Sequence, residues 1–192
     1  MRGCDLLAVQ RERRTVLETA LGIGLMLASG RIAAAEDDPA KIAPQPGDQF
    51  VFFSGDKKGQ VIKVEDLTVG GPQLVAYPVD PKTQMVRNGT RLNSVALVRL
   101  DPAKMSEQTK KNAADGIVAY SAVCTHQGCP VSMWKADTRT LFCACHASQF
   151  DPADAAQVVD GPAPRPLAIL PLKVDGGVPV ASGEFEGRVG FQ

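Results

Sequence analysis

The sequence predicts an all-β fold of one domain, in which a cysteine-rich part is inserted as a pair of loops. From residue 49 onward, short apolar segments alternate with clusters of glycine, proline, asparagine and aspartate, a pattern typical of strands joined by turns. The 192-residue chain contains 18 glycines and 14 prolines, and aromatic residues make up only 5%. This composition favours a loop-rich β protein over a helical bundle.

Eight segments have the residue types of short strands, with β-branched and aromatic side chains between marked turns. The expected strands are residues 49–53, 60–64, 74–77, 94–100, 117–121, 140–142, 168–174 and 188–191. The turns at residues 54–56, 70–72, 87–89 and 175–177 each combine glycine with aspartate, proline or asparagine. Residues 101–115 are polar and contain lysine, which predicts a surface excursion with either a helical turn or partial disorder.

Composition and charge exclude several classes of function. Hydrophobic residues make up 44% of the chain, which suits a packed core and excludes a disordered protein. The 21 basic and 21 acidic side chains cancel, so no net field attracts nucleic acid or an anionic surface. We therefore expect no nucleic-acid partner.

Four of the five cysteines and both histidines lie between Cys124 and His146. They form two boxes, CTHQGCP at residues 124–130 and CACHASQF at residues 143–150. The segment between the boxes has about the length of a hairpin, which would bring two loop tips together. This clustering predicts a metal site.

Two ligand sets are compatible with these residues. A tetrahedral zinc site would use two cysteines and two histidines. Zinc ribbons and fingers usually pair their cysteines and place the histidines separately, whereas each box here supplies both types, and zinc would leave Cys129 and Cys145 unexplained. An iron–sulfur cluster with two thiolates on one iron and two imidazoles on the other would use all six residues, with the spare cysteines in a bridge.

The pattern C-x-H-x-G-C followed by C-x-C-H-x-S resembles the Rieske proteins of cytochrome bc-type complexes and of arsenite oxidase. The resemblance implies a Rieske-type antiparallel β-sandwich with a two-loop cluster-binding subdomain. The domain would span residues 36–192 and the subdomain about residues 120–166. The implied cofactor is one Rieske 2Fe–2S cluster.

The resemblance also assigns roles to single residues. It implies that Cys124 and Cys143 bind the buried iron, and that His126 and His146 bind the outer iron. It further implies a disulfide between Cys129 and Cys145, and a hydrogen bond from the Ser148 hydroxyl to a bridging sulfide.

Neutral imidazoles in place of two thiolates make the cluster easier to reduce, which places such centres at roughly −150 to +300 mV. Phe150 occupies a position where high-potential members have a tyrosine that bonds a cysteine sulfur. Because phenylalanine has no hydroxyl, we expect a potential below the upper end of this range. Ala147 replaces the usual glycine of the family.

Residues 1–35 have the features of an export signal. Basic residues precede an apolar run at residues 20–28, and three alanines at 33–35 are typical of a signal peptidase site. The pair Arg13 and Arg14 resembles a twin-arginine signal, which serves proteins that fold before export. The apolar run is far shorter than the roughly 20 residues that span a bilayer, so we expect cleavage. The alternative is an uncleaved anchor on the periplasmic side of the membrane.

The resemblance leads to two main functional hypotheses for this electron-transfer subunit, which would not be catalytic alone. The first is the small subunit of a periplasmic molybdenum oxidoreductase of arsenite-oxidase type, which passes electrons to a cytochrome c. Residues 117–121, residues 149–151 and the twin-arginine start favour it. The alternative is a quinol-oxidising subunit that works with cytochrome b in a bc-type complex, favoured by residues 160–166, which resemble the proline loop covering the cluster there.

Two further interpretations remain. One is a freestanding periplasmic Rieske carrier. The other is a cytoplasmic Rieske ferredoxin or oxygenase, which the bridging cysteines and the export signal disfavour. An oxygenase would also need a site of two histidines and one carboxylate for mononuclear iron, and both histidines are already used.

Overall fold

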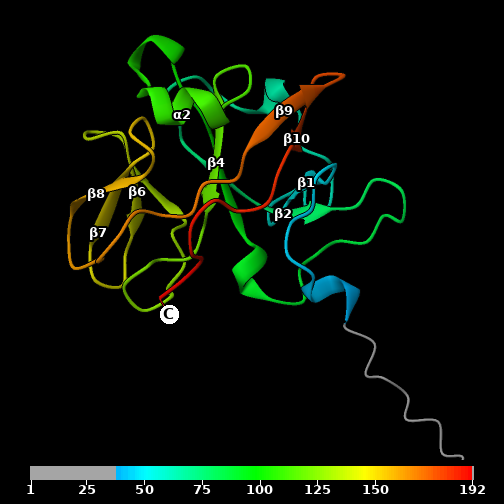
Figure 1. Ribbon diagram of the computed structural model, residues 1–192, viewed down its shortest axis with the longest axis horizontal. Helices are drawn as coiled ribbons and strands as arrows, with labels where there is room; N and C mark the ends of the chain where they lie inside the picture. The colour runs from blue at the N-terminus through cyan, green and yellow to red at the C-terminus, as the bar shows by residue number, and fades with distance from the viewer. Residues whose placement is uncertain (1–37, 192) are drawn as a thin grey trace, which may run out of the picture. The chain divides into compact units, whose positions relative to one another are not determined.

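The computed structural model describes residues 38–191, which form two antiparallel sheets (Figure 1). The larger sheet has six strands in the order β4-β3-β2-β1-β10-β9, and the smaller sheet has four in the order β5-β6-β7-β8. The larger sheet comprises β1 (Gln49–Phe52), β2 (Leu74–Val79), β3 (Val95–Arg99), β4 (Ile117–Ser121), β9 (Leu172–Asp175) and β10 (Val178–Ala181). The smaller sheet comprises β5 (Met133–Lys135), β6 (Thr140–Cys143), β7 (Ser148–Asp151) and β8 (Gln157–Asp160).

The helical elements of the described residues are short. They are η1 (Pro39–Lys41), η2 (Val64–Asp66), η3 (Arg91–Asn93), η4 (Pro102–Lys104) and α2 (Glu107–Asn112). None of the helices between residues 38 and 191 has the length and apolar character required to traverse a bilayer. The export signal predicted at residues 1–35 lies outside the described residues.

The larger sheet almost closes on itself. Residues 168–170 lead into β9, the last strand of the sheet order, and they also pair with β4, the first strand. The Leu170 N–H donates to the Ala119 carbonyl at 2.9 Å, and the Ser121 N–H donates to the Ala168 carbonyl at 2.8 Å. These bonds pair part of the outer edge of β4, which would otherwise be open.

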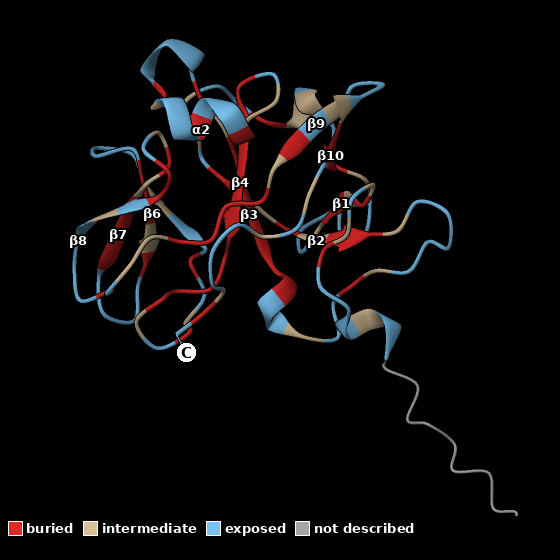
Figure 2. Cartoon of the chain, viewed as in Figure 1, coloured by how far each residue is buried: buried red, intermediate tan, exposed pale blue. Residues whose placement is uncertain are grey.

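Strands β3 and β4 are buried on both faces, because each separates two hydrophobic cores (Figure 2). Val95 and Leu97 of β3 pack in a core that residues of all six strands of the larger sheet share. Ala96 and Val98 face the other way and join a second core with residues of the smaller sheet. Because successive side chains of a strand point to opposite faces, one strand contributes residues to both cores.

Helix α2 supports the loop between β7 and β8. The Ser106 hydroxyl caps the helix by accepting the Thr109 N–H at 3.3 Å. The buried Thr109 hydroxyl accepts the Ala155 N–H at 2.8 Å, and the Tyr120 hydroxyl donates to the Pro152 carbonyl at 2.9 Å. Burial raises the pKa of Tyr120 above its usual value, so the phenol stays protonated as a donor.

The all-β prediction is confirmed, and several predicted strands match in position, including residues 117–121. The segment at residues 60–64 differs, because Val61 forms only a single bridge with Val51 before the chain turns into η2. Residues 188–191 form no strand, since the carbonyls of Arg188 and Gly190 accept hydrogen bonds from Arg165 instead. The sequence-based assignment missed β5, β7, β8 and β10. The helical turn expected within residues 101–115 is present as α2.

Candidate metal centre

The first loop, residues 124–130, leads from β4 toward β5 and is closed by its own backbone. The Cys124 N–H donates to the Cys129 carbonyl at 2.8 Å, and the Gly128 N–H donates to the Cys124 carbonyl at 2.9 Å. A bridge between Val123 and Pro130 closes the base of the loop. These bonds hold the Cys124 side chain inward, where only 1% of the residue is exposed.

The second loop, residues 143–148, is the turn of the hairpin formed by β6 and β7. Cys143 is the last residue of β6, and it lies opposite Ser148, the first residue of β7. Ala147 has a φ of 61°, in the left-handed region that usually favours glycine. The backbone N–H groups of Cys145 and His146 favour the thiolate of Cys143 and so lower its pKa. The turn therefore holds the Cys143 thiol at the end of a strand, near two backbone donors.

The two loops bring four donor side chains together. The thiols of Cys124 and Cys143 are buried and free, and Cys124 lies near enough to raise the pKa of the Cys143 thiol. The rings of His126 and His146 meet edge to face, with their centroids 4.6 Å apart. His146 is exposed and His126 is half-buried, so the sulfurs lie inside and the imidazoles lie toward the surface.

The polar groups at this place fit a metal cluster. The Nδ1 nitrogen of His126 is buried and has no hydrogen-bond partner within residues 38–191. Burial raises the pKa of the Cys143 thiol, and the neighbouring Cys124 raises it further, whereas the two backbone N–H donors favour the thiolate. A buried nitrogen without a partner is costly unless something binds it. Two sulfurs inside and two nitrogens outside match the donor set of a Rieske 2Fe–2S cluster.

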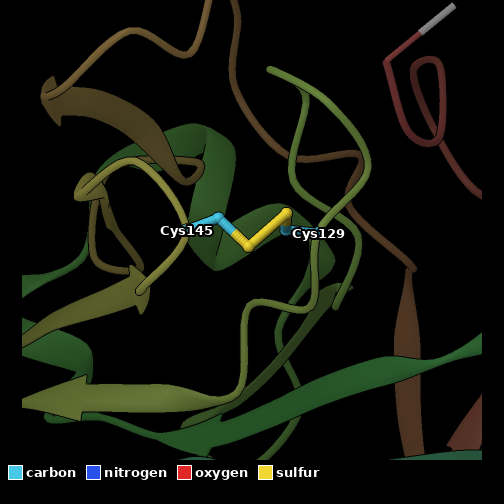
Figure 3. Close-up of a disulfide and its surroundings, with 2 residues drawn as sticks. All are labelled: Cys129 and Cys145. Atoms are coloured by element: carbon cyan, nitrogen blue, oxygen red, sulfur yellow. A yellow bond between two sulfur atoms is a disulfide. The ribbon is translucent and has the colours of Figure 1, made fainter.

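Cys129 and Cys145 form a disulfide that joins the two loops (Figure 3). The Cα atoms of the pair are 6.5 Å apart, and the two side chains extend toward each other from separate loops. Their sulfurs lie within 4.8 Å of the Cys143 sulfur. The disulfide occupies both sulfurs, so they are not available as metal ligands. The predicted disulfide is confirmed.

A third segment, the proline loop at residues 160–166, covers both cysteine loops. The Thr125 hydroxyl donates to the Arg165 carbonyl at 2.7 Å, which joins the proline loop to the first loop. The Ala163 N–H donates to the buried Ser148 hydroxyl oxygen at 3.2 Å, which joins it to the second loop. The Ser148 oxygen accepts this bond, so its hydroxyl hydrogen remains available for another acceptor.

Close contact of the proline loop depends on Gly161. This residue has a φ of +84°, and a Cβ at this position would lie 2.5 Å from the Ser148 Cα and 2.8 Å from its nitrogen. Both atoms belong to the backbone, so no side-chain rotation would relieve the clash. Only glycine allows this approach without movement of the chain.

The sequence pattern does not mark Thr125 or Arg165 as functional residues. The one sequence feature that could have pointed to Thr125 is its position between two predicted ligands, Cys124 and His126. The Arg165 guanidinium donates to the Arg188 carbonyl at 2.5 Å and also to the Gly190 carbonyl. It thereby joins the proline loop to the last part of the chain, a contact that no local pattern encodes.

Two inward thiols, two outward imidazoles and a disulfide between their loops define an all-β iron–sulfur protein with a site close to its surface. The family model of the Rieske [2Fe-2S] domain matches residues 61–171, and the chain belongs to this family. The protein thus binds one 2Fe–2S cluster and transfers electrons through it. The family and the cofactor expected from the sequence are both confirmed.

Curated relatives include Rieske iron–sulfur subunits of cytochrome bc1 complexes. The chain is 41% identical to the Streptomyces lividans subunit over 99 residues, which cover 50% of this chain and 58% of the relative. It is 36% identical to the Mycobacterium tuberculosis subunit over 146 residues, which cover 67% of this chain and 34% of the relative. The chain therefore spans less than two thirds of the length of these relatives.

Solved structures with a similar fold include a hyperthermophilic respiratory Complex III chain. It is 20% identical, with a TM-score of 0.47, and the match covers 91% of this chain and 100% of that chain. The plasma membrane Rieske protein of Synechocystis PCC 6803 is 26% identical, with a TM-score of 0.37, over 57% of this chain and 84% of that chain.

Proposed function

We propose that the protein is the Rieske subunit of a cytochrome bc-type complex and passes single electrons from a quinol to a cytochrome of the c type. The observation behind this proposal is the pair of buried thiols beneath two imidazoles whose rings meet at 4.6 Å. The similarity to cytochrome bc1 subunits supports the assignment to this complex. The proposed ligands are Cys124, His126, Cys143 and His146.

Each ligand pair has a distinct task in this proposal. Cys124 and Cys143, both 1% exposed, would hold one iron of the cluster away from water. His126 and His146 would hold the other iron, and the exposed His146 lies where a partner can approach. The bound cluster would supply the group that accepts and releases one electron. A hydrogen bond from the Ser148 hydroxyl to the cluster would favour the reduced state.

The comparisons favour the bc-type alternative over the small subunit of a molybdenum oxidoreductase. That first hypothesis depended on short similarities near Tyr120 and Phe150 and on the start of the chain. The curated relatives are bc1 subunits instead, and a molybdenum partner finds no support among them. The proposed partners are therefore cytochrome b and a cytochrome c, with no nucleic acid.

We propose that the protein works on the periplasmic side of the membrane after export as a folded unit. The disulfide between Cys129 and Cys145 supports this location, because disulfides persist in oxidising compartments. The arginine pair at residues 13 and 14 supports the twin-arginine route, which accepts proteins that already contain a cluster. Fractionation of cells and N-terminal sequencing of the isolated protein test the location and the cleavage after residue 35. Cytoplasmic recovery with an intact start would overturn this part of the proposal.

The experiment that tests the complex is isolation of the tagged native protein with its partners under mild conditions. The isolated material is assayed for haem b, molybdenum and the paramagnetic signal of the reduced cluster. We expect haem b without molybdenum. Molybdenum without haem b would restore the oxidoreductase hypothesis, and a cluster protein free of both would indicate a freestanding carrier. Either result would overturn the bc-type proposal.

A further inference from the structure

Strands β7 and β8 pair with a shift in register next to the metal centre. Gln149 lies opposite Asp160, whereas the next residue, Phe150, lies opposite Val158. Val159 is therefore the extra residue of a β-bulge, and it is 55% exposed. Bulges often redirect a neighbouring side chain next to an active site. Here the bulge places the Asp160 carboxylate on the side of Gln149.

A chain of polar side chains crosses the smaller sheet at this place. The hydroxyls of Thr138 and Thr140 lie 2.8 Å apart, and both are within reach of the Gln149 Oε1, at 3.3 and 3.1 Å. The Gln149 Nε2 donates to the Asp160 Oδ2 at 2.7 Å. The other oxygen of Asp160 accepts the Gly161 N–H at 2.8 Å. This series of hydrogen bonds therefore ends on Gly161, the one glycine of the proline loop.

This chain fixes the proline loop where it meets Ser148. Gln149 is 7% exposed, so its amide has little access to water as a substitute partner. Gly161 is in backbone contact with Ser148, and two residues later the Ala163 N–H donates to the Ser148 hydroxyl oxygen. A change in the position of Asp160 would move both contacts together.

We propose that Gln149 and Asp160 are positioning residues that set the redox potential by holding the proline loop on Ser148. The Ala163 N–H occupies one lone pair of the Ser148 oxygen, which leaves the hydroxyl hydrogen available for a hydrogen bond to the cluster. Gln149 and Asp160 are not among the proposed ligands, and they act through Ser148. The inference rests on the proposed role of Ser148 beside the cluster.

An exchange of functional groups between the two positions tests this inference. Gln149→Glu alone puts two carboxylates in contact, and the loop should detach from Ser148. Combining Gln149→Glu with Asp160→Asn restores one carboxylate and one amide of the same lengths, and the threonine hydroxyls keep an acceptor. The exposed Gln157 lies on β8, as Asp160 does. Gln157→Glu is therefore the control for the added negative charge.

Two readouts are measured on the cluster-containing protein, the midpoint potential and the hydrogen exchange of a peptide covering residues 160–166. We expect Gln149→Glu to lower the potential and to speed exchange about tenfold, the effect of losing one charge-assisted hydrogen bond. The double variant should return both values to those of the wild type. If Gln149→Glu fails to fold, Asp160→Asn replaces it, with the same expected direction of exchange.

Comparison with Ser148→Ala separates failure of this inference from failure of the proposed role of Ser148. If Ser148→Ala shifts the potential but Gln149→Glu acts no differently from Gln157→Glu, the positioning role is wrong. A double variant that keeps the shifted values would also overturn it. If Ser148→Ala itself leaves the potential unchanged, the proposed role of Ser148 falls, and this inference falls with it.

Discussion

The Thr125 hydroxyl donates to the Arg165 carbonyl at 2.7 Å, across a sequence separation of 40 residues. Thr125 is 1% exposed, so water does not replace this bond when it is lost. The contact joins the first cysteine loop to the proline loop, and the Ala163 to Ser148 bond does the same for the second. The three loops therefore form one structural unit around the metal centre.

We expect Thr125→Val to lower the free energy of unfolding by about 1–3 kcal/mol, because it removes the buried hydrogen bond between the two loops. Denaturant unfolding of the cluster-containing protein measures this change. The exposed Thr68 provides the control, since Thr68→Val should change stability by less than about 0.5 kcal/mol. Equal effects of the two variants would contradict the importance of the loop contact.

Gly161→Ala should destabilise the protein more than Gly55→Ala. Both glycines have positive φ values, +84° and +80°, but only Gly161 would place a Cβ against backbone atoms. The left-handed conformation costs either alanine about 1–2 kcal/mol, and the clash with Ser148 adds to this at Gly161 alone. Thermal unfolding of the two variants measures the difference. Identical stabilities would show that the proline loop moves aside without cost.

Loss of the disulfide should destabilise the loops without removing any proposed ligand. The bridge spans a sequence separation of 16 residues, for which chain entropy gives about 3 kcal/mol. The double variant Cys129→Ser with Cys145→Ser should unfold at correspondingly lower denaturant concentration. Its iron content in the native buffer should stay close to that of the wild type. Complete loss of iron together with unchanged protein stability would contradict this separation of roles.

Replacement of a proposed ligand, unlike loss of the disulfide, should remove bound iron from the protein. We expect His146→Ala and Cys143→Ser each to lose bound iron and sulfide, because three protein ligands do not complete the donor set. Chemical assays of iron and sulfide, together with zinc analysis, measure the outcome. Retention of stoichiometric iron in either variant would overturn the ligand assignment. Zinc without iron in the wild type would overturn the family-based cofactor for this chain.

Phe150→Tyr should raise the midpoint potential if the added hydroxyl reaches a cysteine sulfur. Phe150 is fully buried in the core between the sheets, so the larger side chain should also reduce stability by about 1–3 kcal/mol. Protein film voltammetry measures the potential, and Phe150→Leu controls for altered packing. A tyrosine variant with the potential of the leucine variant would show that position 150 does not tune the centre.

The cysteine and histidine boxes could be recognised from the sequence because metal ligands demand fixed residue types at fixed spacings. The strands near them were harder to predict. Residues 148–151 form β7, although only Phe150 among them is typical of a strand, because the hairpin with β6 imposes the pairing. Likewise, Val159 has no local property that indicates a bulge. Its position depends on the register between β7 and β8, which only the folded sheet defines.

The burial of β4 on both faces also has a consequence for unfolding. Ile117 and Ala119 belong to the core of the larger sheet, whereas Val118 and Tyr120 belong to the core next to the cysteine loops. Neither core can open without exposing part of the other, so the two sheets should behave as a single cooperative unit. Backbone amides of β4 should then exchange with solvent only through global unfolding, and the metal centre should share the stability of the whole domain.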